Sequence, residues 1–276
     1  MTSHDVVDAA RRRLRTKRIG HGGTLDPGAT GVLVLGVGKA TKLLRYAQAS
    51  PKRYRATARF GTTTTTQDAA GDVVEQRPAK ITSEDVSVAL KDFVGDIDQI
   101  PPMVSAVKVG GERLYRKALR GEEVERAARR VTVYSLKLLD FVEEGLAGAP
   151  EATLDVSCSA GTYVRTLVHD VGAALGCGAH LISLRRIAAG GWEEGDAVAL
   201  DSIGPGDLRP LSDAVRDLPA LEVGEDGASL VADGRPLEVR TDVPEGGLVA
   251  VLHDGDLLGV YRRRGQNLVA DRVVPR

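Results

Sequence analysis

The apolar residues near the start of the chain recur at helical spacing. They are Val6, Val7, Ala10 and Leu14, and arginines occupy the opposite face. This pattern predicts an amphipathic helix over residues 4–16. Thr2 and Asp5 have the spacing of a capping box, in which each side chain bonds the backbone N–H of the other residue. We therefore expect a capped helix that follows Ser3 and runs from His4 to about Thr16.

Alternating apolar and polar residues predict strands farther along the chain. In residues 52–60, Tyr54, Ala56, Ala58 and Phe60 share one face, which is the period of a strand. The alternation recurs in two later segments, and a continuous apolar run predicts one more strand, a buried one. These three segments are residues 131–142, 153–159 and 32–37.

Three further segments carry helix signals: residues 38–47, 83–93 and 165–175. We expect Ser83 to cap the second of them, because Glu84 and Asp85 follow it as in a helix N-terminus. Residues 62–66 are consecutive threonines, a run too short to indicate disorder. With the polar residues that follow, they predict a loop.

The order of these elements favours an α+β fold, because strands and helices interleave without the regular rhythm of a doubly wound sheet. Residues 204–210 are rich in glycine and proline and predict a boundary or a long loop. Short apolar runs follow, and one pair is separated by Asp254 and Gly255, a hairpin signal. We therefore divide the chain into a large domain, residues 1–212, and a small β-rich domain, residues 213–276.

The composition is that of a globular protein and excludes several classes. Of 276 residues, 42% are hydrophobic and 27% charged, which excludes a disordered or fibrous chain. The longest apolar run, residues 32–37, is far shorter than the roughly 20 residues of a membrane-spanning helix. The N-terminus also lacks the pattern of a secretory signal.

The cysteines and histidines predict no metal and no disulfide. Cys158 and Cys177 are too few for a disulfide framework and do not have the spacing of a zinc site. We expect both to be buried and reduced, in a cytoplasmic protein. The five histidines are scattered without ligand spacing, so we expect no structural metal.

The net charge of −1 hides an uneven distribution. Residues 1–60 contain thirteen lysines and arginines against three acidic residues, a local balance of +10, so the rest of the chain sums to −11. A strongly basic end suggests a surface that binds a polyanion such as nucleic acid. A solvated helix face is the alternative, since six of these cations lie between Arg11 and Arg18.

Two segments contain candidate catalytic residues. Asp26 precedes Pro27 in the glycine-rich segment 20–31, where the backbone can approach a ligand closely. An ordinary turn is the alternative there. Tyr163 and Arg165 follow a predicted strand end and a glycine, so an aromatic ring and a cation can point at one place; a packed tyrosine and a surface arginine are the alternative. The sequence has neither a P-loop nor a nucleophile elbow.

Blocks of sequence from residue 20 to residue 186 resemble the tRNA pseudouridine synthases of the TruB type, in family order. They are GHGGTLDPGATG at 20–31, KRYR at 52–55, DAAG at 68–71, QIPPMVSAVK at 99–108, LYRKALRG at 114–121, CSAGTYVRTLVHD at 158–170 and LGCGAHLISLRR at 175–186. The resemblance implies a mixed, largely antiparallel sheet flanked by helices. It also implies a PUA-like module in the small C-terminal domain.

The resemblance implies that Asp26 is a nucleophile. In the family, such an aspartate attacks a uridine flipped out of the T loop of tRNA, at position 55, and the base detaches, rotates and rejoins through carbon. Whether the ribose or the base is attacked stays open. Arg165 matches the arginine that pairs with the aspartate, and a nearby cation favours the ionised carboxylate. Tyr54 matches the tyrosine that stacks on the flipped base and is a candidate to help remove the C5 proton.

Further positions match the family's substrate-binding residues. Tyr163 and Leu184 correspond to positions of the base pocket, and His21 to the histidine that takes the place of the extruded base. Lys108, which we count with the substrate-binding residues, and Asp68 lie in motifs whose implied role is to order the cleft. The reaction implies neither a cofactor nor a metal.

The implied partner is the T stem-loop of tRNA, and we expect a monomer without a membrane or an obligatory protein partner. Basic residues near the N-terminus and on the predicted C-terminal hairpin are expected to contact phosphates, which positions RNA without reading its sequence. Besides the cations between Arg11 and Arg18, they are Lys39, Lys42, Arg45, Lys52, Arg53, Arg55, Arg262, Arg263 and Arg264.

Two alternatives to a stand-alone enzyme stay open. The first is a non-catalytic tRNA-binding or tRNA-folding protein on the same scaffold. Asp26, Tyr54 and Arg165 together argue against it, because a bare carboxylate in an RNA cleft weakens binding. The second is the guide-RNA-dependent branch of the superfamily, whose members usually carry lysine-rich tails, unlike residues 274–276.

The N-terminus departs from the family pattern. Family members begin with a strand and a Lys-Pro dipeptide before a Thr-Ser-His-Asp motif, whereas this sequence opens with Met1 and that motif. We expect translation to start upstream of Met1. A chain without the edge strand is expected to be less stable and less active.

Overall fold

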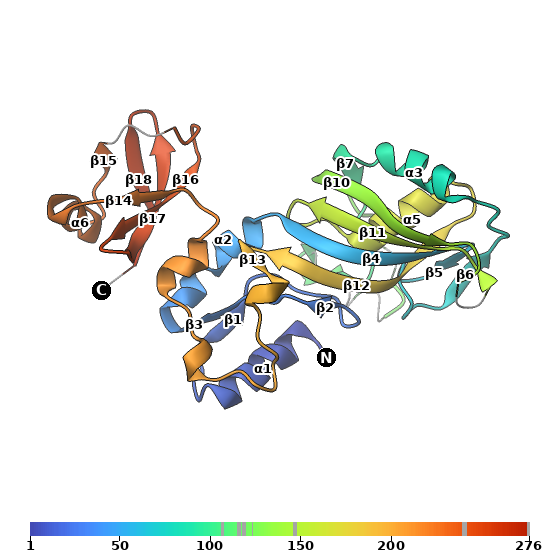
Figure 1. Ribbon diagram of the computed structural model, residues 1–276, viewed down its shortest axis with the longest axis horizontal. Coiled ribbons are helices and arrows are strands. Elements are labelled where there is room, and N and C mark those ends of the chain that lie inside the picture. The colour runs from blue at the N-terminus through green and yellow to red at the C-terminus, as the bar shows by residue number, and fades with distance from the viewer. Residues whose placement is uncertain are drawn as a thin grey trace. The chain divides into compact units, whose positions relative to one another are not determined.

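The computed structural model describes residues 1–105, 108–114, 117, 120–122, 124–145, 148–238 and 242–274, with the backbone alone at 108, 109 and 113 (Figure 1). The chain forms two compact units. The first consists of Met1–Thr24, Leu33–Ser50 and Gly190–Arg276, and the second of Leu25–Val32 and Pro51–Ala189. No helix within the described ranges is long and apolar enough to cross a membrane.

The second unit is built on a largely antiparallel sheet, as predicted. Its strands are ordered β12 (Ala179–Ala189), β4 (Lys52–Phe60), β11 (Glu151–Cys158), β10 (Arg129–Val142) and β7 (Gly95–Gln99), and the short β2 (Thr30–Gly31) pairs parallel to β12. In Figure 1, β4 and β12 are the long blue and yellow arrows side by side. The alternation of β4 buries Ala56, Ala58 and Phe60, which confirms the predicted face.

Two helices cover this sheet and complete one hydrophobic core. Helix α3 (Ser83–Lys91) packs against β10, and α5 (Val164–Ala174) packs against β12. Val86 of α3 and Leu167 of α5 are completely buried in the same core as Leu154 of β11. The α+β fold with a sheet flanked by helices is therefore confirmed.

Three local predictions for the second unit and its neighbour were wrong in detail. The N-cap of α3 is Thr82 rather than Ser83, because Thr82 and Asp85 form a reciprocal capping box. The threonine run is not all loop: β5 (Thr62–Thr64) pairs with β6 (Val73–Gln76), which gives the polar residues a hydrogen-bonding partner. Of the strand predicted at 32–37, only β3 (Leu35–Val37) forms, because Val32 bonds Arg186 instead.

The first unit begins with helix α1 (Ser3–Arg13), whose predicted capping box between Thr2 and Asp5 is present. Strands β1 (Ile19–His21) and β3 pair antiparallel, and η1 (Gly38–Lys42) and α2 (Leu44–Ala49) follow. Short elements lie between residues 190 and 219. They are β13 (Trp192–Glu193), η3 (Glu194–Asp196), η4 (Pro205–Asp207) and η5 (Leu211–Val215).

The C-terminal part of the first unit is a small sheet, as the short apolar runs predicted. Its strands are ordered β14 (Ala220–Glu222), β16 (Leu248–His253), β17 (Asp256–Arg264), β18 (Asn267–Val273) and β15 (Leu237–Glu238). Asp254 and Gly255 both have positive φ, as expected for the tight turn between β16 and β17. Helix α6 (Glu225–Ala232) was not predicted and buries Ala228 and Val231 in the module's core.

Within the first unit, α2 packs on the C-terminal sheet. Leu43 and Tyr46 are buried with Val215, Ala250 and Val260 in one apolar cluster. The first unit thus combines residues 1–24 and 33–50 with the C-terminal part of the chain. This grouping by contacts differs from the division into domains 1–212 and 213–276 that we predicted from the sequence. That residues 213–276 fold as a separate domain, with a boundary at residue 212, stays a prediction.

Two hairpins complete the described part of the second unit. One is the β5–β6 pair given above, and the other consists of β8 (Lys108–Val109) and β9 (Glu112–Arg113). Its backbone is described, but the side chain of Lys108 lies outside the described part, so its predicted contact with substrate stays a prediction.

Candidate active site

Asp26 lies on a segment of the second unit that is fastened to the edge of the sheet. The N–H of Ala29 donates to the backbone carbonyl of Asp26 at 2.9 Å, which closes a turn around Pro27. Five residues after Asp26, Gly31 has φ +97° and lies so close to β12 that a Cβ would stand 2.1 Å from the carbonyl oxygen of Arg186. A glycine is therefore required where this segment joins the sheet.

Arg165 lies in the first turn of α5, and its guanidinium contacts two carboxylates. Its side chain is only 4% exposed. Nη1 donates to Oδ2 of Asp68 at 3.1 Å, and Nη2 donates to the backbone carbonyl of Val104. The remaining nitrogen, Nε, is buried without a hydrogen bond and lies 3.7 Å from Oδ2 of Asp26. Other partners thus hold the arginine in place, and its Nε remains available for the ion pair with Asp26.

Asp68 is itself fixed by the turn that follows β5. Its Oδ1 accepts from the hydroxyl of Thr66 at 2.5 Å and from the N–H of Ala70 at 3.0 Å. The hydroxyl of Thr64 donates to its backbone carbonyl. Because Asp68 cannot rotate without losing these bonds, it holds Arg165 in one orientation.

The pKa of Asp26 is raised above its ordinary value. Burial is the largest cause, the positive charge of Arg165 opposes it, and the negative charge of Asp68 adds to it. At the same time 39% of the Asp26 side chain stays accessible, so a substrate can reach the carboxylate. The site therefore contains a reachable, poorly hydrated acid beside a fixed cation.

The predicted aromatic residues belong to the same unit. Tyr54 on β4 is half-buried against the main core, and burial raises the pKa of its phenol, although the cation of Arg186 opposes this. Tyr163 caps α5, and both its backbone N–H and its carbonyl are bonded by the side chain of Gln99. The guanidinium of Arg165 lies 5.9 Å from the centre of the Tyr163 ring. Leu184 on β12 is buried in the core that Tyr54 contacts.

His21 is the one predicted site residue with a described side chain that belongs to the first unit. There it pairs with Leu35 in the β1–β3 ladder and its carbonyl accepts from Gln48. Its predicted role in base flipping stays a prediction.

The sequence did not identify the buried partner of the Asp26 segment. Arg186 is 1% exposed, and its Nε donates to the carbonyl of Val32 at 2.7 Å. Gln99, 2% exposed, likewise fixes the start of α5 through Tyr163. The local sequence pattern does not single out either residue. For Arg186 the reason is that Arg185 is adjacent, and only the register of β12 decides which of the two arginines is buried.

Several of the side chains predicted to contact phosphates are buried or form ion pairs within the protein. Lys52 is buried, Arg53 pairs with Asp155 at 2.6 Å, and Arg45 and Arg262 both pair with Asp271. These side chains have partners within the protein, so a role in holding RNA stays a prediction. Arg55, Arg264 and the cations near η1 are exposed.

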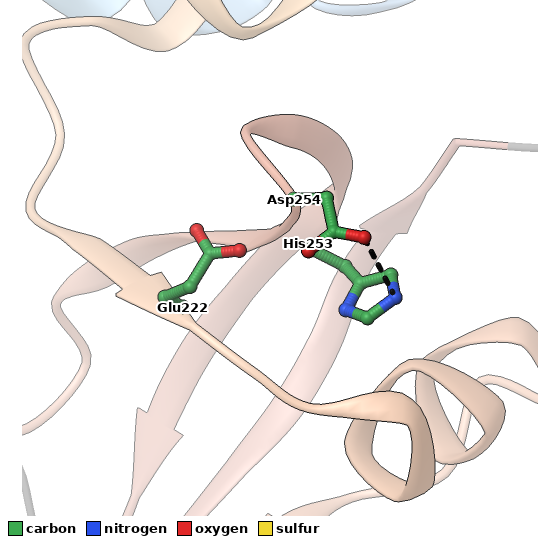
Figure 2. A group of neighbouring side chains, drawn as sticks. All are labelled: Glu222, His253 and Asp254. Carbon is green, nitrogen blue, oxygen red and sulfur yellow. Dashed lines mark ion pairs between the residues drawn. The ribbon is translucent and has the colours of Figure 1, made fainter.

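One group of described residues has the donor types of a metal site. Glu222, His253 and Asp254 each offer a ligand atom within 4.8 Å of the others (Figure 2). His253 Nδ1 bonds the carbonyl of Val223 at 2.8 Å, and Nε2 lies 3.7 Å from Asp254. Both carboxylates are exposed, and exposed groups of this kind are common without a metal, so the cluster carries no functional argument here.

Comparisons with known proteins agree with the resemblance seen in the sequence. The family model described as TruB family pseudouridylate synthase (N terminal domain) matches residues 11–164, and the model described as tRNA pseudouridylate synthase B C-terminal domain matches residues 165–205. The chain is 49% identical to tRNA pseudouridine synthase B of Symbiobacterium thermophilum over 87% of its length and 80% of the relative's. It is 42% identical to the protein of that name from Cupriavidus pinatubonensis, over 99% and 90% of the two lengths.

A solved structure supports the same assignment. The structure titled as a Cbf5-Nop10-Gar1 complex aligns with all of this chain and 82% of its own, with a TM-score of 0.76 and 26% identity. The family models, the relatives and the shared fold agree over most of the chain. The chain belongs to the TruB family of pseudouridylate synthases, which are isomerases.

Proposed function

We propose that this chain converts uridine 55 in the T loop of tRNA to pseudouridine, with Asp26 as the nucleophile. The observation that carries the proposal is the ion pair between an accessible Asp26 and a buried, otherwise fixed Arg165. A carboxylate is a weak nucleophile, and exact placement beside a cation is what makes it useful in covalent catalysis. The names of the relatives, tRNA pseudouridine synthase B, support tRNA as the substrate.

The proposed reaction rearranges the uridine without adding or removing atoms. A carboxylate oxygen of Asp26 bonds either C1′ of the ribose or C6 of the base, and the bond between N1 and C1′ breaks. The base turns and C5 bonds C1′, the bond to the Asp26 oxygen breaks and restores the carboxylate, C5 releases its proton, and N1 ends with a proton. Since product and substrate are isomers, the reaction needs no oxidant, reductant or co-substrate.

The cation of Arg165 has two effects in this proposal. It favours the ionised form of Asp26 against the burial that raises the pKa, and it fixes the direction of the carboxylate. Asp68 is a positioning residue, because it acts through Arg165 and not on the substrate.

The remaining predicted site residues receive roles in base binding. Tyr54 stacks on the flipped uracil, and its raised phenol pKa means that it must pass on its own proton if it receives the C5 proton. Tyr163 and Leu184 line the base pocket, His21 fills the place of the extruded base, and Lys108 orders the cleft. Stacking suits Tyr54 because every base has a π-face.

We also propose a stand-alone monomeric enzyme that acts in the cytoplasm. One structural neighbour is titled as a complex with Nop10 and Gar1, whereas the curated relatives, which are more similar in sequence, carry the name tRNA pseudouridine synthase B without a named partner. The proposal therefore gives recognition of tRNA to this chain alone.

The test is tritium release from tRNA labelled at uridine C5. Wild type is expected to release tritium, and Asp26→Asn to slow the release by at least about 1,000-fold, because the nucleophile is lost with little change in bulk. Asp140→Asn, which changes an exposed carboxylate on β10, is the matched control and should behave as wild type. A transcript with cytidine at position 55 should release nothing.

The outcomes separate the alternatives. Release by Asp26→Asn at the wild-type rate would contradict the assignment of the nucleophile. Tight tRNA binding without release by wild type would favour the non-catalytic binding protein. Release that appears only after guide RNA and partner proteins are added would favour the guided branch.

A further inference from the structure

A cationic cavity in the first unit is lined by none of the residues of the proposed reaction. It measures about 150 Å³ and is lined by residues of two parts of the chain. They are Arg18, Lys39, Lys42 and Leu43 near the N-terminus, and Arg272, Val273 and Val274 at the end of β18. A water molecule takes about 30 Å³ in the liquid, so the cavity has room for a group of several heavy atoms. No carboxylate is among the described residues that line it.

Arg272 is the residue that points most directly to a ligand. Its Nε is buried and has no hydrogen-bond partner within the described structure. Arg272 as a whole is only partly buried and lines the cavity. A buried donor without a partner is unfavourable unless an acceptor is supplied. The neighbouring carboxylate, Asp271, does not supply one, because it accepts from Tyr46, Arg45 and Arg262.

The other cations present their charges around the same space. Lys42 lies at the end of η1 and Arg18 precedes β1; both are exposed, and Nε of Arg18 donates to the hydroxyl of Thr41 at 3.2 Å. Lys39 lies on the same turn as Lys42. Like charges at one cavity repel one another, and a compact anion with several acceptor oxygens would relieve that repulsion.

We propose that this cavity is a phosphate-binding site shared by the N-terminal segment and the C-terminal module. Arginine suits it because its planar donors match phosphate oxygens, and the lysines add charge without directional demands. The phosphate belongs either to an RNA backbone or to free inorganic phosphate. Binding of an RNA phosphate rests on the proposed function, whereas binding of inorganic phosphate does not.

The test compares Arg272→Gln and Lys42→Gln with wild type and with Arg235→Gln. Arg235 is an exposed arginine of the same C-terminal module outside the cavity, and serves as the matched control. Lys42 is exposed, so its variant keeps the test decisive if Arg272→Gln fails to fold. Two measurements are made on the full chain: affinity for a tRNA transcript over a range of salt concentrations, and thermal unfolding in sodium phosphate against sodium chloride at equal ionic strength.

A phosphate of RNA in the cavity predicts that both variants bind the transcript several-fold more weakly. The slope of log affinity against log salt should become shallower by about 0.7 to 0.9, the value for one lost phosphate contact, and Arg235→Gln should keep the wild-type slope. Inorganic phosphate predicts instead that phosphate raises the melting temperature of wild type and of Arg235→Gln, and that the two cavity variants lose this stabilisation.

The proposal is overturned if the cavity variants match Arg235→Gln in both measurements. Tritium release by wild type is measured on the same transcript. Its absence would contradict the proposed function, while the phosphate measurement would still decide the fate of the cavity.

Discussion

At the scale of single residues, the proposed chemistry of this protein depends on one carboxylate, Asp26, in an environment that disfavours its charge. Burial raises the pKa of Asp26, and Arg165 only partly offsets that effect. Stability and activity therefore place opposite demands on this side chain, since the ionised form that the proposed reaction needs is the form that the folded protein disfavours.

Asp26→Asn is expected to raise the melting temperature at pH 7. The folded-state pKa of Asp26 lies above its unfolded value, so the folded protein binds the proton more tightly and wild type gains stability as pH falls through the raised pKa. The neutral amide does not have that unfavourable charge at pH 7. Thermal unfolding from pH 7 to pH 4 should show the difference between the two proteins shrinking toward acid.

The raised pKa of Asp26 also predicts how the rate of the proposed reaction falls at acid pH. kcat/KM should fall as pH drops through the raised pKa of Asp26, above the ordinary value of 3.8, because the protonated acid is no nucleophile. A fall in kcat/KM with an apparent pKa at or below 3.8 would show that burial does not raise the pKa of this carboxyl group.

At the scale of elements, the Asp26 segment is held in place by the sheet edge more than by its own turn. Gly31 brings the backbone against β12, Val32 N–H donates to the carbonyl of Arg186, and the buried Arg186 side chain donates back to Val32. A change at this junction should therefore act both on stability and on Asp26.

Gly31→Ala is expected to lower the free energy of unfolding by roughly 2–4 kcal/mol and to reduce tritium release. The added Cβ meets backbone at 2.1 Å, in a region of φ that L residues rarely adopt. Gly28→Ala, in the same loop, is the control: its Cβ would meet nothing within 4 Å, so it should leave stability within about 1 kcal/mol of wild type. Urea denaturation measures both, and equal effects of the two changes would contradict this account of the junction.

At the scale of the whole molecule, distant parts of the chain meet inside the first unit. Tyr46 of α2 donates to Asp271 at 2.6 Å, and Arg45 and Arg262 pair with the same carboxylate. Burial alone would raise the pKa of Asp271, but the bonds from Tyr46 and Arg262 and the charge of Arg45 outweigh it and lower that pKa. Burial also raises the pKa of Tyr46 to about 12.

Asp271→Asn should therefore destabilise the protein by about 2 kcal/mol, since it weakens hydrogen bonds to a charged acceptor. Tyr46→Phe, which keeps the ring in its apolar cluster, should lose about 1 kcal/mol. Because the Asp271 pKa is lowered, its contribution is complete above the unfolded pKa and is lost as pH falls through the folded value. Denaturant unfolding at pH 7 checks the ranking, and a larger loss for Tyr46→Phe would refute it.

The sequence by itself determined the features that depend on neighbours along the chain. Helix α1 and its capping box, the alternation of β4 and the turn at Asp254 and Gly255 are all encoded within a few residues. The capping of α3 was missed by one residue, because Thr82 and Ser83 are both good N-caps and only the bond to Asp85 separates them. The sequence blocks from residue 20 to residue 186, taken together in family order, were enough to indicate the family.

The tertiary structure decided what depends on residues far apart in the sequence. Asp68 and Arg165 meet across 97 positions, and the register of β12 selects Arg186 for burial. The pKa of Asp26 follows from both the burial and the charges that this folding brings together. The cavity with Arg272 likewise exists only because the C-terminal strand returns to the first fifty residues. Local sequence patterns specify the period of each helix or strand and the caps of the helices. Charge pairing and desolvation depend instead on which elements pack together, and the hydrophobic core as a whole decides that.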